Sequence, residues 1–393
     1  MQTLAEKRIL LGVSGGIAIY KSLSLLSLLN KAGAITEVIM TDGAMEFVSP
    51  LTFQTMSKKK VHYDLFSEED DFIPHIDLTR RNDIFLIAPA TANVIAKLAH
   101  GISDDLLTST ALAATCPIVL APAMNVYMYE NKATQENLEI LRKRGIEVLE
   151  PNAGLLACDE VGAGRMPEAE ELCDYLDSFF TKKDLVNKKI LVSCGSTKER
   201  MDPVRYMTND SSGKQGLALA IRAKKRGADV TLIHGRIQVD IPKNIPSIQI
   251  ESTKDLLEAC QREFPKHDCL IMAAAPADYR VAHPSQEKIK KNREGKLLVE
   301  FLENPDILAT IGQNKGARTL IGFAAETENG IENAKKKLVK KNLDYIVLND
   351  IKKPGAGFDV DTNIVTIINQ EQERSLPLMS KSQVADTILD LLV

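Results

Sequence analysis

Apolar runs alternate with stretches of helical periodicity along almost the whole chain. An apolar run at 9–13, a helical stretch at 17–30 and a second apolar run at 35–40 form a βαβ pattern. The next predicted elements are strands at 84–88 and 118–121 and helices at 91–99, 106–114 and 169–180. Because strands joined through helices pair in parallel, this half predicts an α/β fold with a parallel sheet.

The same alternation begins again after the polar segment 181–189, which is typical of a linker. We therefore predict two domains, 1–183 and 184–393. In the second, strands are predicted at 190–193, 229–234, 269–274, 319–323, 345–348 and 364–368, and helices at 216–226, 253–264, 331–341 and 383–392. The chain is expected to fold as two doubly wound, Rossmann-like domains of the α/β class.

Composition narrows the class of protein further. A chain of 393 residues is too long to fold around one compact core. The hydrophobic fraction of 44% and the charged fraction of 26% are those of a globular protein. A net charge of -4 points neither to nucleic acid nor to an anionic membrane. The start of the chain lacks a signal-peptide pattern, and the six cysteines form no CxxC pair. We expect a cytoplasmic protein with reduced thiols and no structural zinc site.

The first chemical signal is Gly12-Val13-Ser14-Gly15-Gly16, which ends the first predicted strand and leads into a helix. Glycines at such a turn let backbone amides and a helix N-terminus approach a phosphate. The spacing differs from the GxGxxG of dinucleotide-binding proteins, so a mononucleotide such as FMN is as plausible as NAD. A glycine turn that binds no ligand is equally compatible with this motif.

Four loops follow predicted strands at the edge where open α/β sheets bind ligands: 40–44, 88–93, 121–125 and 154–166. With these loops, the first half resembles the flavin-dependent cysteine decarboxylases that act on 4'-phosphopantothenoylcysteine. The resemblance implies a flavodoxin-like flavoprotein domain and maps catalysis onto His75, Asn125 and Cys158. It implies that FMN is contacted by Ser14, Gly15, Thr41, Phe53, Pro89, Thr91 and Asn93. Arg81, Asn82 and Tyr129 depart from the family pattern.

Decarboxylation of a cysteinyl group requires a cofactor, because loss of CO2 would leave a carbanion that no neighbouring group stabilises. A flavin that first oxidises the thiol to a thioaldehyde lets the sulfur function absorb these electrons and gives an enethiolate. Returning the hydride also needs a proton, for which Cys158 is the expected donor. The family implies that His75 handles protons in the oxidative half and that the Asn125 amide binds the substrate carboxylate.

The second half carries polar loops at 195–199 and 202–214 and a basic run at 288–291. Gly213-Lys214 is not a Walker phosphate loop, because the upstream glycine and the following Ser or Thr are missing. Lys337 and Lys341 share one helical face and could bind a triphosphate, although solvated surface lysines fit the same spacing.

Together these motifs resemble the bacterial, CTP-using phosphopantothenate–cysteine ligases. The resemblance implies an acyl-cytidylate, whose charge Lys288 stabilises and which Arg205 and Asn209 hold. It implies a CTP pocket formed by Ala273, Ala274, Ala275, Asp278, Lys288, Asn304, Pro305, Asp306, Ile307, Phe323, Lys337 and Lys341. Magnesium is expected to arrive with CTP rather than in a protein cage. Cys194 and Pro276 depart from the motifs and leave CTP or ATP open.

The two resemblances imply a homo-oligomer, with flavin sites between N-terminal subunits and paired ligase domains.

Three other functions compete with the predicted decarboxylase and ligase. An NAD-dependent dehydrogenase would explain two α/β halves but lacks GxGxxG. A decarboxylase of C-terminal cysteines in peptides would share the first domain and have no use for the second. A non-catalytic binding protein would keep the folds without the trio of His75, Asn125 and Cys158.

Overall fold

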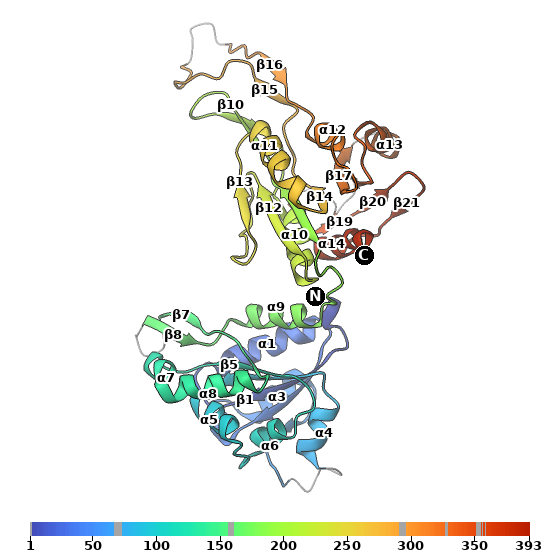
Figure 1. Cartoon of the computed structure of the whole chain (residues 1–393). Helices are drawn as coiled ribbons and strands as arrows, with labels where there is room; N and C mark the ends of the chain where they lie inside the picture. Colours follow the sequence, from blue (N-terminus) through green and yellow to red (C-terminus); the bar gives the residue numbers. More distant parts are fainter. Residues whose placement is uncertain are drawn as a thin grey trace. The chain divides into compact units, whose positions relative to one another are not determined.

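The computed structural model divides the chain into two compact units, Met1–Thr181 and Lys182–Val393. It describes residues 2–66, 73–155, 161–290, 296–326, 329–350, 355, 357 and 359–393. Each unit is a layered α/β domain (Figure 1). In the part of the chain so described, none of the helices has both the length and the apolar character to span a membrane.

The first unit is built on a parallel sheet in the order β3-β2-β1-β4-β5-β6. Its strands are β1 (Arg8–Val13), β2 (Ile35–Met40), β3 (Val61–His62), β4 (Ile84–Ala90), β5 (Ile118–Pro122) and β6 (Glu147–Val148). The chain reverses its winding direction between β1 and β4, which is the ligand-binding point of a doubly wound sheet. Without the two-residue edge strand β3, the order is that of flavodoxin-like proteins.

Helices cover both faces of this sheet, and a hydrophobic core lies on each side. One core involves α1 (Ile19–Lys31), α3 (Pro50–Ser57) and α9 (Ala169–Phe180). The other involves α4 (Pro74–Arg80), α5 (Ala92–His100), α6 (Leu106–Leu112), α7 (Val126–Glu130) and α8 (Lys132–Lys143). Short helix α2 (Asp42–Met45) and the hairpin of β7 (Asn152–Leu155) and β8 (Val161–Arg165) follow strand ends. Burial on both faces explains why β1 and β4 are continuously apolar.

The second unit repeats the order of the first in six parallel strands, β13-β12-β9-β14-β17-β18, and adds antiparallel β20 and β21. These strands are β9 (Lys189–Cys194), β12 (Asp229–His234), β13 (Ser247–Gln249), β14 (Cys269–Met272), β17 (Thr319–Glu326), β18 (Tyr345–Asp350), β20 (Val365–Ile368) and β21 (Glu373–Ser375). Its winding direction reverses between β9 and β14.

Helices again cover both faces of the second sheet. The pair α10 (Lys214–Lys225) and α14 (Lys381–Leu389) packs on one face, and α11 (Thr253–Glu263), α12 (Ile307–Gly312) and α13 (Gly330–Lys340) pack on the other. Three two-stranded sheets complete the unit: β10 (Lys198–Arg200) with β11 (Tyr206–Thr208), β15 (Tyr279–Val281) with β16 (Phe301–Glu303), and β19 (Thr362–Asn363) with β22 (Met379–Ser380).

The segment predicted as a linker is attached to the second unit. Leu185 is fully buried in its core, and both oxygens of Asp184 accept hydrogen bonds from Arg226 at 2.8 and 3.1 Å. These bonds hold the pKa of the Asp184 carboxyl below its usual value. The chain is therefore ordered from the end of α9 into β9, although its polar composition is typical of a loop.

Candidate functional site

The first unit has a cavity of about 670 Å³ beside the point where β1 and β4 diverge. Its wall comes from the N-terminal turn of α1, the loop after β4, the loop after β5 and the end of β8. The lining residues are Gly15, Gly16, Ile17, Ala18, Tyr20, Lys21, Thr91, Ala92, Ala123, Met124, Asn125, Met128, Gly164, Arg165 and Met166. This volume is within the range of small-molecule and cofactor sites.

Hydrogen bonds of Ser14 join the loops that follow β1 and β4. Its buried hydroxyl donates to the Pro89 carbonyl at 2.7 Å and accepts from the Thr91 amide at 3.1 Å. Thr91 in turn caps α5, accepting a hydrogen bond from the Val94 amide. The two loops therefore form one preorganised wall, with Thr91 facing the cavity and Ser14 behind it.

A close approach of backbones explains the glycine after Ser14. A Cβ atom on Gly15 would lie 2.5 Å from the carbonyl oxygen of Gly43, in the segment after β2. Any side chain at this position would push the two strand-end loops apart. Thr41 holds the second loop, because its hydroxyl caps α2 by accepting from the Ala44 amide at 3.3 Å.

Among the seven residues expected to contact FMN, Gly15 and Thr91 line the cavity of this chain. Ser14 and Thr41 support its loops, while Phe53 is fully buried in the core. Pro89 contributes its carbonyl to the Ser14 bond, and Asn93 is exposed on α5. Phe53 therefore packs on the core and does not face the cavity.

Of the expected catalytic trio, Asn125 lines the cavity of this chain and His75 does not. Asn125 lines the cavity, and its Oδ1 accepts a hydrogen bond from the Tyr127 amide at 2.8 Å, which orients the carboxamide. His75, on α4, is not among the lining residues. Cys158 lies outside the residues that the structure describes, but Gly164 and Arg165, which follow it in the same hairpin, reach the cavity.

Sequence patterns missed one buried charge in the cavity wall. The Lys21 side chain is 4% exposed, and its ammonium donates to the Met166 carbonyl at 2.7 Å and to Glu168 at 2.9 Å. The hydrogen bond from Lys21 holds the pKa of the Glu168 carboxyl below its usual value. On an apolar helix, a lone lysine gives no signal of a buried ion pair, so only packing identifies this one.

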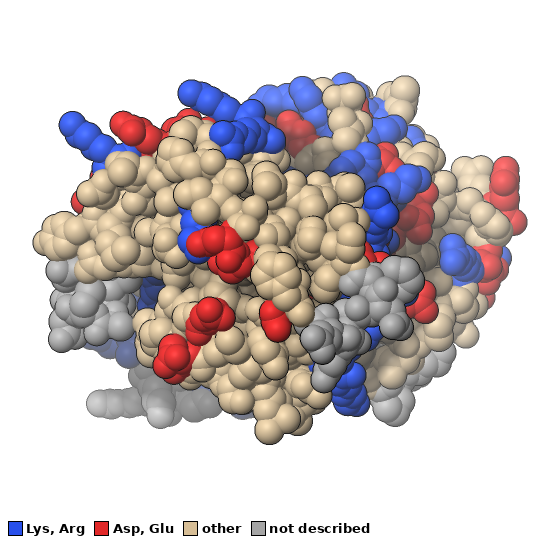
Figure 2. All heavy atoms as spheres, turned by 90° about the horizontal axis from the view of Figure 1, so that it is seen from below, with Lys and Arg blue, Asp and Glu red and all other residues tan. Residues whose placement is uncertain are grey.

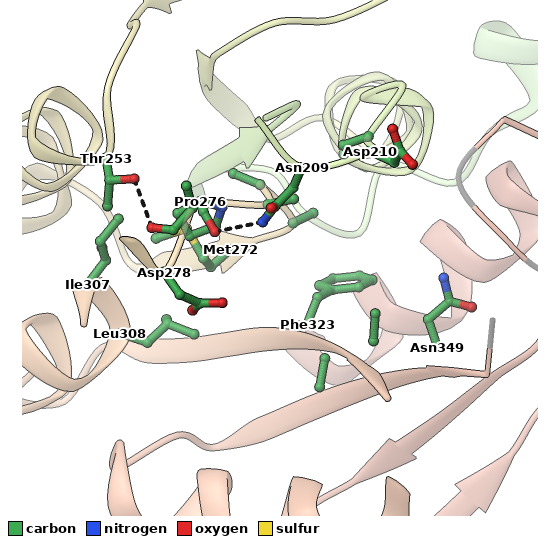
Figure 3. A pocket seen from close by; sticks show the side chains of 18 of the residues that line it. Asn209, Asp210, Thr253, Met272, Pro276, Asp278, Ile307, Leu308, Phe323 and Asn349 are labelled. Carbon is green, nitrogen blue, oxygen red and sulfur yellow. Dashed lines mark hydrogen bonds between the residues drawn. The ribbon is translucent and has the colours of Figure 1, made fainter. Parts of the chain in front are cut away.

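A second cavity, of about 980 Å³, lies at the carboxyl ends of β9, β14, β17 and β18 in the second unit (Figure 3). Of the residues expected to bind nucleotide or intermediate, twelve line it: Asn209, Ala273, Ala274, Ala275, Asp278, Asn304, Pro305, Asp306, Ile307, Phe323, Lys337 and Lys341. The structure therefore brings together residues that are separated by up to 132 positions along the chain. Asn349 and Lys381, which the sequence patterns missed, also line the cavity.

Hydrogen bonds shape the loop after β14. Asn209 donates to the Pro276 carbonyl at 3.0 Å, while Thr253 and Asn304 both donate to the Ala277 carbonyl, at 3.3 and 2.9 Å. The close-up in Figure 3 shows Asn209 and Thr253 pointing toward this loop from opposite sides. The carbonyls of the loop are thereby satisfied from neighbouring elements, which holds its backbone in one conformation.

Lysines of α13 and of its C-cap differ in what they face. Lys337 and Lys341 line the cavity and pair with Glu326 at 2.5 Å and Asp306 at 3.0 Å. Lys336 pairs instead with Glu332 of its own helix and is 70% exposed. Lys336 is therefore a solvated surface lysine, whereas Lys337 and Lys341 can reach an anion bound in the cavity.

Lys288 and Arg205 do not line this cavity. Both are exposed, and Asp202 ties their segments together because its carboxylate accepts from the Arg205 and Ile289 amides at 2.7 and 3.1 Å. Arg205 also donates to the Ile289 carbonyl at 3.2 Å. The expectation that these two side chains share a site with Asn209 is thus not met within a single copy.

The lowered pKa of Lys381 should make the free energy of unfolding depend on pH. Burial, and then the nearby ammonium of Lys214, lower its pKa to about 8. Between pH 8 and about 10.4, the pKa of an unfolded lysine, the unfolded chain binds more protons, so stability rises with pH. We compare the free energy of urea unfolding of the natural protein with that of Lys381→Met. Between pH 7 and pH 10, we expect the difference to shift by on the order of 1 kcal/mol in favour of the natural protein. An unchanged difference between the two proteins would contradict this.

Comparison with known proteins covers both units. The family model described as Flavoprotein matches residues 1–181, and the model of the DNA/pantothenate metabolism flavoprotein C-terminal domain matches 185–393. The chain is 44% identical over 395 residues to the coenzyme A biosynthesis bifunctional protein CoaBC of Vibrio cholerae, covering 100% of this chain and 99% of that protein. It is 45% identical over 392 residues to CoaBC of Bacillus subtilis, with 98% and 96% covered.

Solved structures match each half separately. The crystal structure of the C-terminal domain of CoaBC shares 39% identity and covers 54% of this chain and 96% of its own, with a TM-score of 0.46. A PPC decarboxylase mutant complexed with pantothenoylaminoethenethiol shares 30% identity and covers 44% of this chain and 98% of its own, with a TM-score of 0.41.

Proposed function

The chain belongs to the bifunctional CoaBC family of coenzyme A biosynthesis, which couples cysteine ligation to FMN-dependent decarboxylation, and we propose how its two units divide this chemistry. The second unit ligates cysteine to 4'-phosphopantothenate, and the first decarboxylates the resulting 4'-phosphopantothenoylcysteine. Each unit has a cavity at the reversal point of its sheet, and this pairing of two sites supports the division.

FMN fits the first cavity. The absence of a side chain at Gly15 and Gly16 leaves backbone exposed where β1 leads into α1, and Thr91 and Asn125 add neutral polar groups to the wall. Ser14, Gly15 and Thr91 would hold the flavin nucleotide, with Thr41 and Pro89 supporting the loops. When bound, the flavin supplies the two-electron chemistry that makes loss of CO2 feasible.

The residues of this chain then handle binding and protons. Asn125, oriented through the Tyr127 amide, binds the substrate carboxylate. His75 accepts a proton from the substrate in the oxidative half, for which an imidazole is suited near neutral pH. Cys158 gives a proton to carbon when the enethiol is reduced. Arg165, paired with Glu168 at 2.8 Å, places a cation at the same cavity wall as Asn125.

We infer that His75 acts on the cavity of a second copy. Large apolar side chains are exposed near the cavity, with Ile17 64%, Tyr20 55% and Tyr127 68% exposed. In the view of Figure 2, residues without charge cover much of the visible face, and Lys and Arg side chains lie mainly toward its upper and right edges. Exposed apolar patches of this kind mark surfaces that another protein covers. A homo-oligomer would bury them and complete the trio.

Mixing two inactive variants tests this assembly. His75→Asn and Cys158→Ser are each expected to lose 4'-phosphopantetheine formation, but hybrids made by co-expression should regain a substantial fraction of the natural activity. The reason is that a hybrid contains sites with one intact His75 and one intact Cys158. Each variant mixed only with itself is the control, and light scattering on the same samples measures subunit number. Hybrids as inactive as their parents would show that both residues act within one copy.

In the second unit, we propose CTP as the activating nucleotide. A carboxylate oxygen of 4'-phosphopantothenate attacks the α-phosphorus of CTP, and the bond to the bridging β-oxygen breaks to release pyrophosphate. The cysteine amine then attacks the acyl carbon, loses a proton and displaces CMP. Phe323 and Ile307 offer apolar contacts to the base and ribose, and Lys337 and Lys341 offer cations to the phosphates.

Arg205 and Lys288 enter the reaction in a dimer of ligase units. Their exposure and their mutual attachment through Asp202 suit residues that reach the cavity of a neighbouring copy. We propose that magnesium comes with CTP, whose phosphates bind it. We also propose a cytoplasmic location, without nucleic-acid or membrane partners.

The purified protein tests the whole proposal in two measurements. We expect a yellow flavin absorbance that is released as FMN on denaturation. We also expect pyrophosphate release that requires CTP, 4'-phosphopantothenate and, for turnover, cysteine. A colourless protein that takes up no FMN would contradict the first half, and equal turnover with ATP would remove CTP from the second.

A further inference from the structure

Arg81 joins two carboxylates that belong to different elements of the first unit. Its Nη1 lies 2.6 Å from Asp77 Oδ2 on α4, and its Nε lies 2.8 Å from Glu37 Oε2 on β2. Asn82 donates to the same Glu37 oxygen at 3.4 Å and to the Leu78 carbonyl at 2.8 Å. This cluster ties the end of α4 to a central strand of the sheet.

Glu37 provides a rigid attachment point. It lies within β2, where it is in register with Leu10 of β1, and its side chain is 8% exposed. Among the described residues, removing Arg81 would leave this carboxylate with the Asn82 amide at 3.4 Å and the Lys59 ammonium at 3.7 Å. A planar guanidinium can bond two carboxylates at fixed angles, which the single ammonium of a lysine does not reproduce.

Helix α4 carries His75 near its N-terminal end. The imidazole Nδ1 is buried, and no partner is found for it among the residues that the structure describes. In many catalytic sites a carboxylate or carbonyl holds the second ring nitrogen and sets its orientation. Among the described residues no side chain or carbonyl fixes this nitrogen, so the position of the α4 backbone contributes to the orientation of the imidazole.

That position depends on tertiary contacts, because α4 has seven residues and Ile73 provides no side-chain cap at its start. Leu78 is buried in the core beside the sheet, and the Thr79 hydroxyl lies 3.4 Å from the Ala113 carbonyl. The ionic bridge from Asp77 through Arg81 to Glu37 adds a third connection, which attaches the C-terminal end of α4 to β2.

We propose that Arg81 is a positioning residue that sets the catalytic orientation of His75 through the Glu37–Arg81–Asp77 bridge. The inference rests on the proposed function of His75 in the oxidative half of the decarboxylation. It assigns to Arg81 no contact with substrate or flavin. Its effect should consequently pass through His75 alone.

A double-mutant cycle on the full, FMN-loaded protein measures this dependence. Stopped-flow absorbance follows flavin reduction by 4'-phosphopantothenoylcysteine in His75→Asn, Arg81→Met and the double variant. We expect Arg81→Met to reduce flavin about 10- to 100-fold more slowly, as for other orienting contacts. The double variant should be no slower than His75→Asn, because the positioning effect has nothing left to act on.

A second readout does not depend on turnover. Hydrogen exchange of the α4 amides should accelerate in Arg81→Met and remain unchanged in His75→Asn, in the protein without substrate. Arg142→Met is the matched control, since Arg142 bridges Glu139 and Glu150 at 3.0 Å each and lines neither cavity. It should leave flavin reduction and α4 exchange unchanged. Glu37→Gln, which preserves side-chain shape, replaces Arg81→Met in the cycle if that variant fails to fold.

The outcomes separate the inference from the function on which it rests. Additive losses in the double variant, or a natural rate in Arg81→Met beside a slow His75→Asn, would overturn the positioning role and leave the proposed function standing. A natural rate of flavin reduction in His75→Asn would overturn both. The positioning role is supported if Arg81→Met reduces flavin slowly, the double variant is no slower than His75→Asn, and the α4 amides exchange faster in Arg81→Met.

Discussion

Replacing Cys158 by serine should abolish formation of 4'-phosphopantetheine while sparing release of CO2. The oxidative half needs no proton from Cys158, so the variant should decarboxylate its substrate once and accumulate the enethiol. Loss of a general acid typically lowers a rate by about 10²- to 10⁴-fold. Serine has the size of cysteine but holds its proton too tightly to donate it to carbon. Mass spectrometry distinguishes the enethiol from the product, which is heavier by two hydrogens.

Cys116→Ser is the matched control for this experiment. Cys116 is half-buried, does not line the cavity, and burial raises the pKa of its thiol, so it is not expected to donate a proton. Its variant should make 4'-phosphopantetheine at the natural rate. Normal product from Cys158→Ser, or an equal loss in both variants, would remove Cys158 from the mechanism.

Replacing Lys288 by glutamine should nearly abolish pyrophosphate release from CTP. Charge accumulates on the pentavalent phosphorus and on the leaving pyrophosphate, and removing one group that stabilises such charge costs about 10²- to 10³-fold in rate. The glutamine retains a hydrogen-bond donor but no charge. Coupled detection of pyrophosphate, with CTP and 4'-phosphopantothenate supplied, measures the step before cysteine enters.

The neighbouring lysine provides the control, because Lys290 is equally exposed and lies two positions further along the same segment. Lys290→Gln should release pyrophosphate within a few-fold of the natural rate. Both variants should decarboxylate added 4'-phosphopantothenoylcysteine normally, since that reaction belongs to the other unit. If pyrophosphate release slowed equally in Lys288→Gln and Lys290→Gln, the effect would come from basic charge in general, and Lys288 would have no specific role.

The strand and helix pattern was largely predictable, because burial on both faces makes the central parts of β1, β9 and β17 apolar. Elements without such a pattern were missed. They include α4, which begins at a proline, and the hairpins β10–β11 and β15–β16, whose strands have three residues each. Short elements of this kind owe their conformation to contacts with the rest of the fold, and those contacts leave no periodic signal.

The ligase cavity was also accessible from sequence. Asn209 and Asp278 lie in loops after predicted strands, Phe323 ends a predicted strand, and carboxyl ends of parallel strands meet at one edge. Lys288 and Arg205 share no such rule, because they lie in irregular chain around a small hairpin. Their separation from the cavity therefore emerged only when the chain was folded.

Taken alone, the amino-acid sequence determined the two α/β units, the location of their ligand-binding edges and the glycine at which two loop backbones meet. These properties follow from local periodicity and from steric limits on single residues. Tertiary structure decided that His75 stands apart from Asn125, that Lys21 is a buried ion pair and that Arg81 links α4 to the sheet. Distances between side chains on separate elements depend on how those elements pack, which no local pattern encodes.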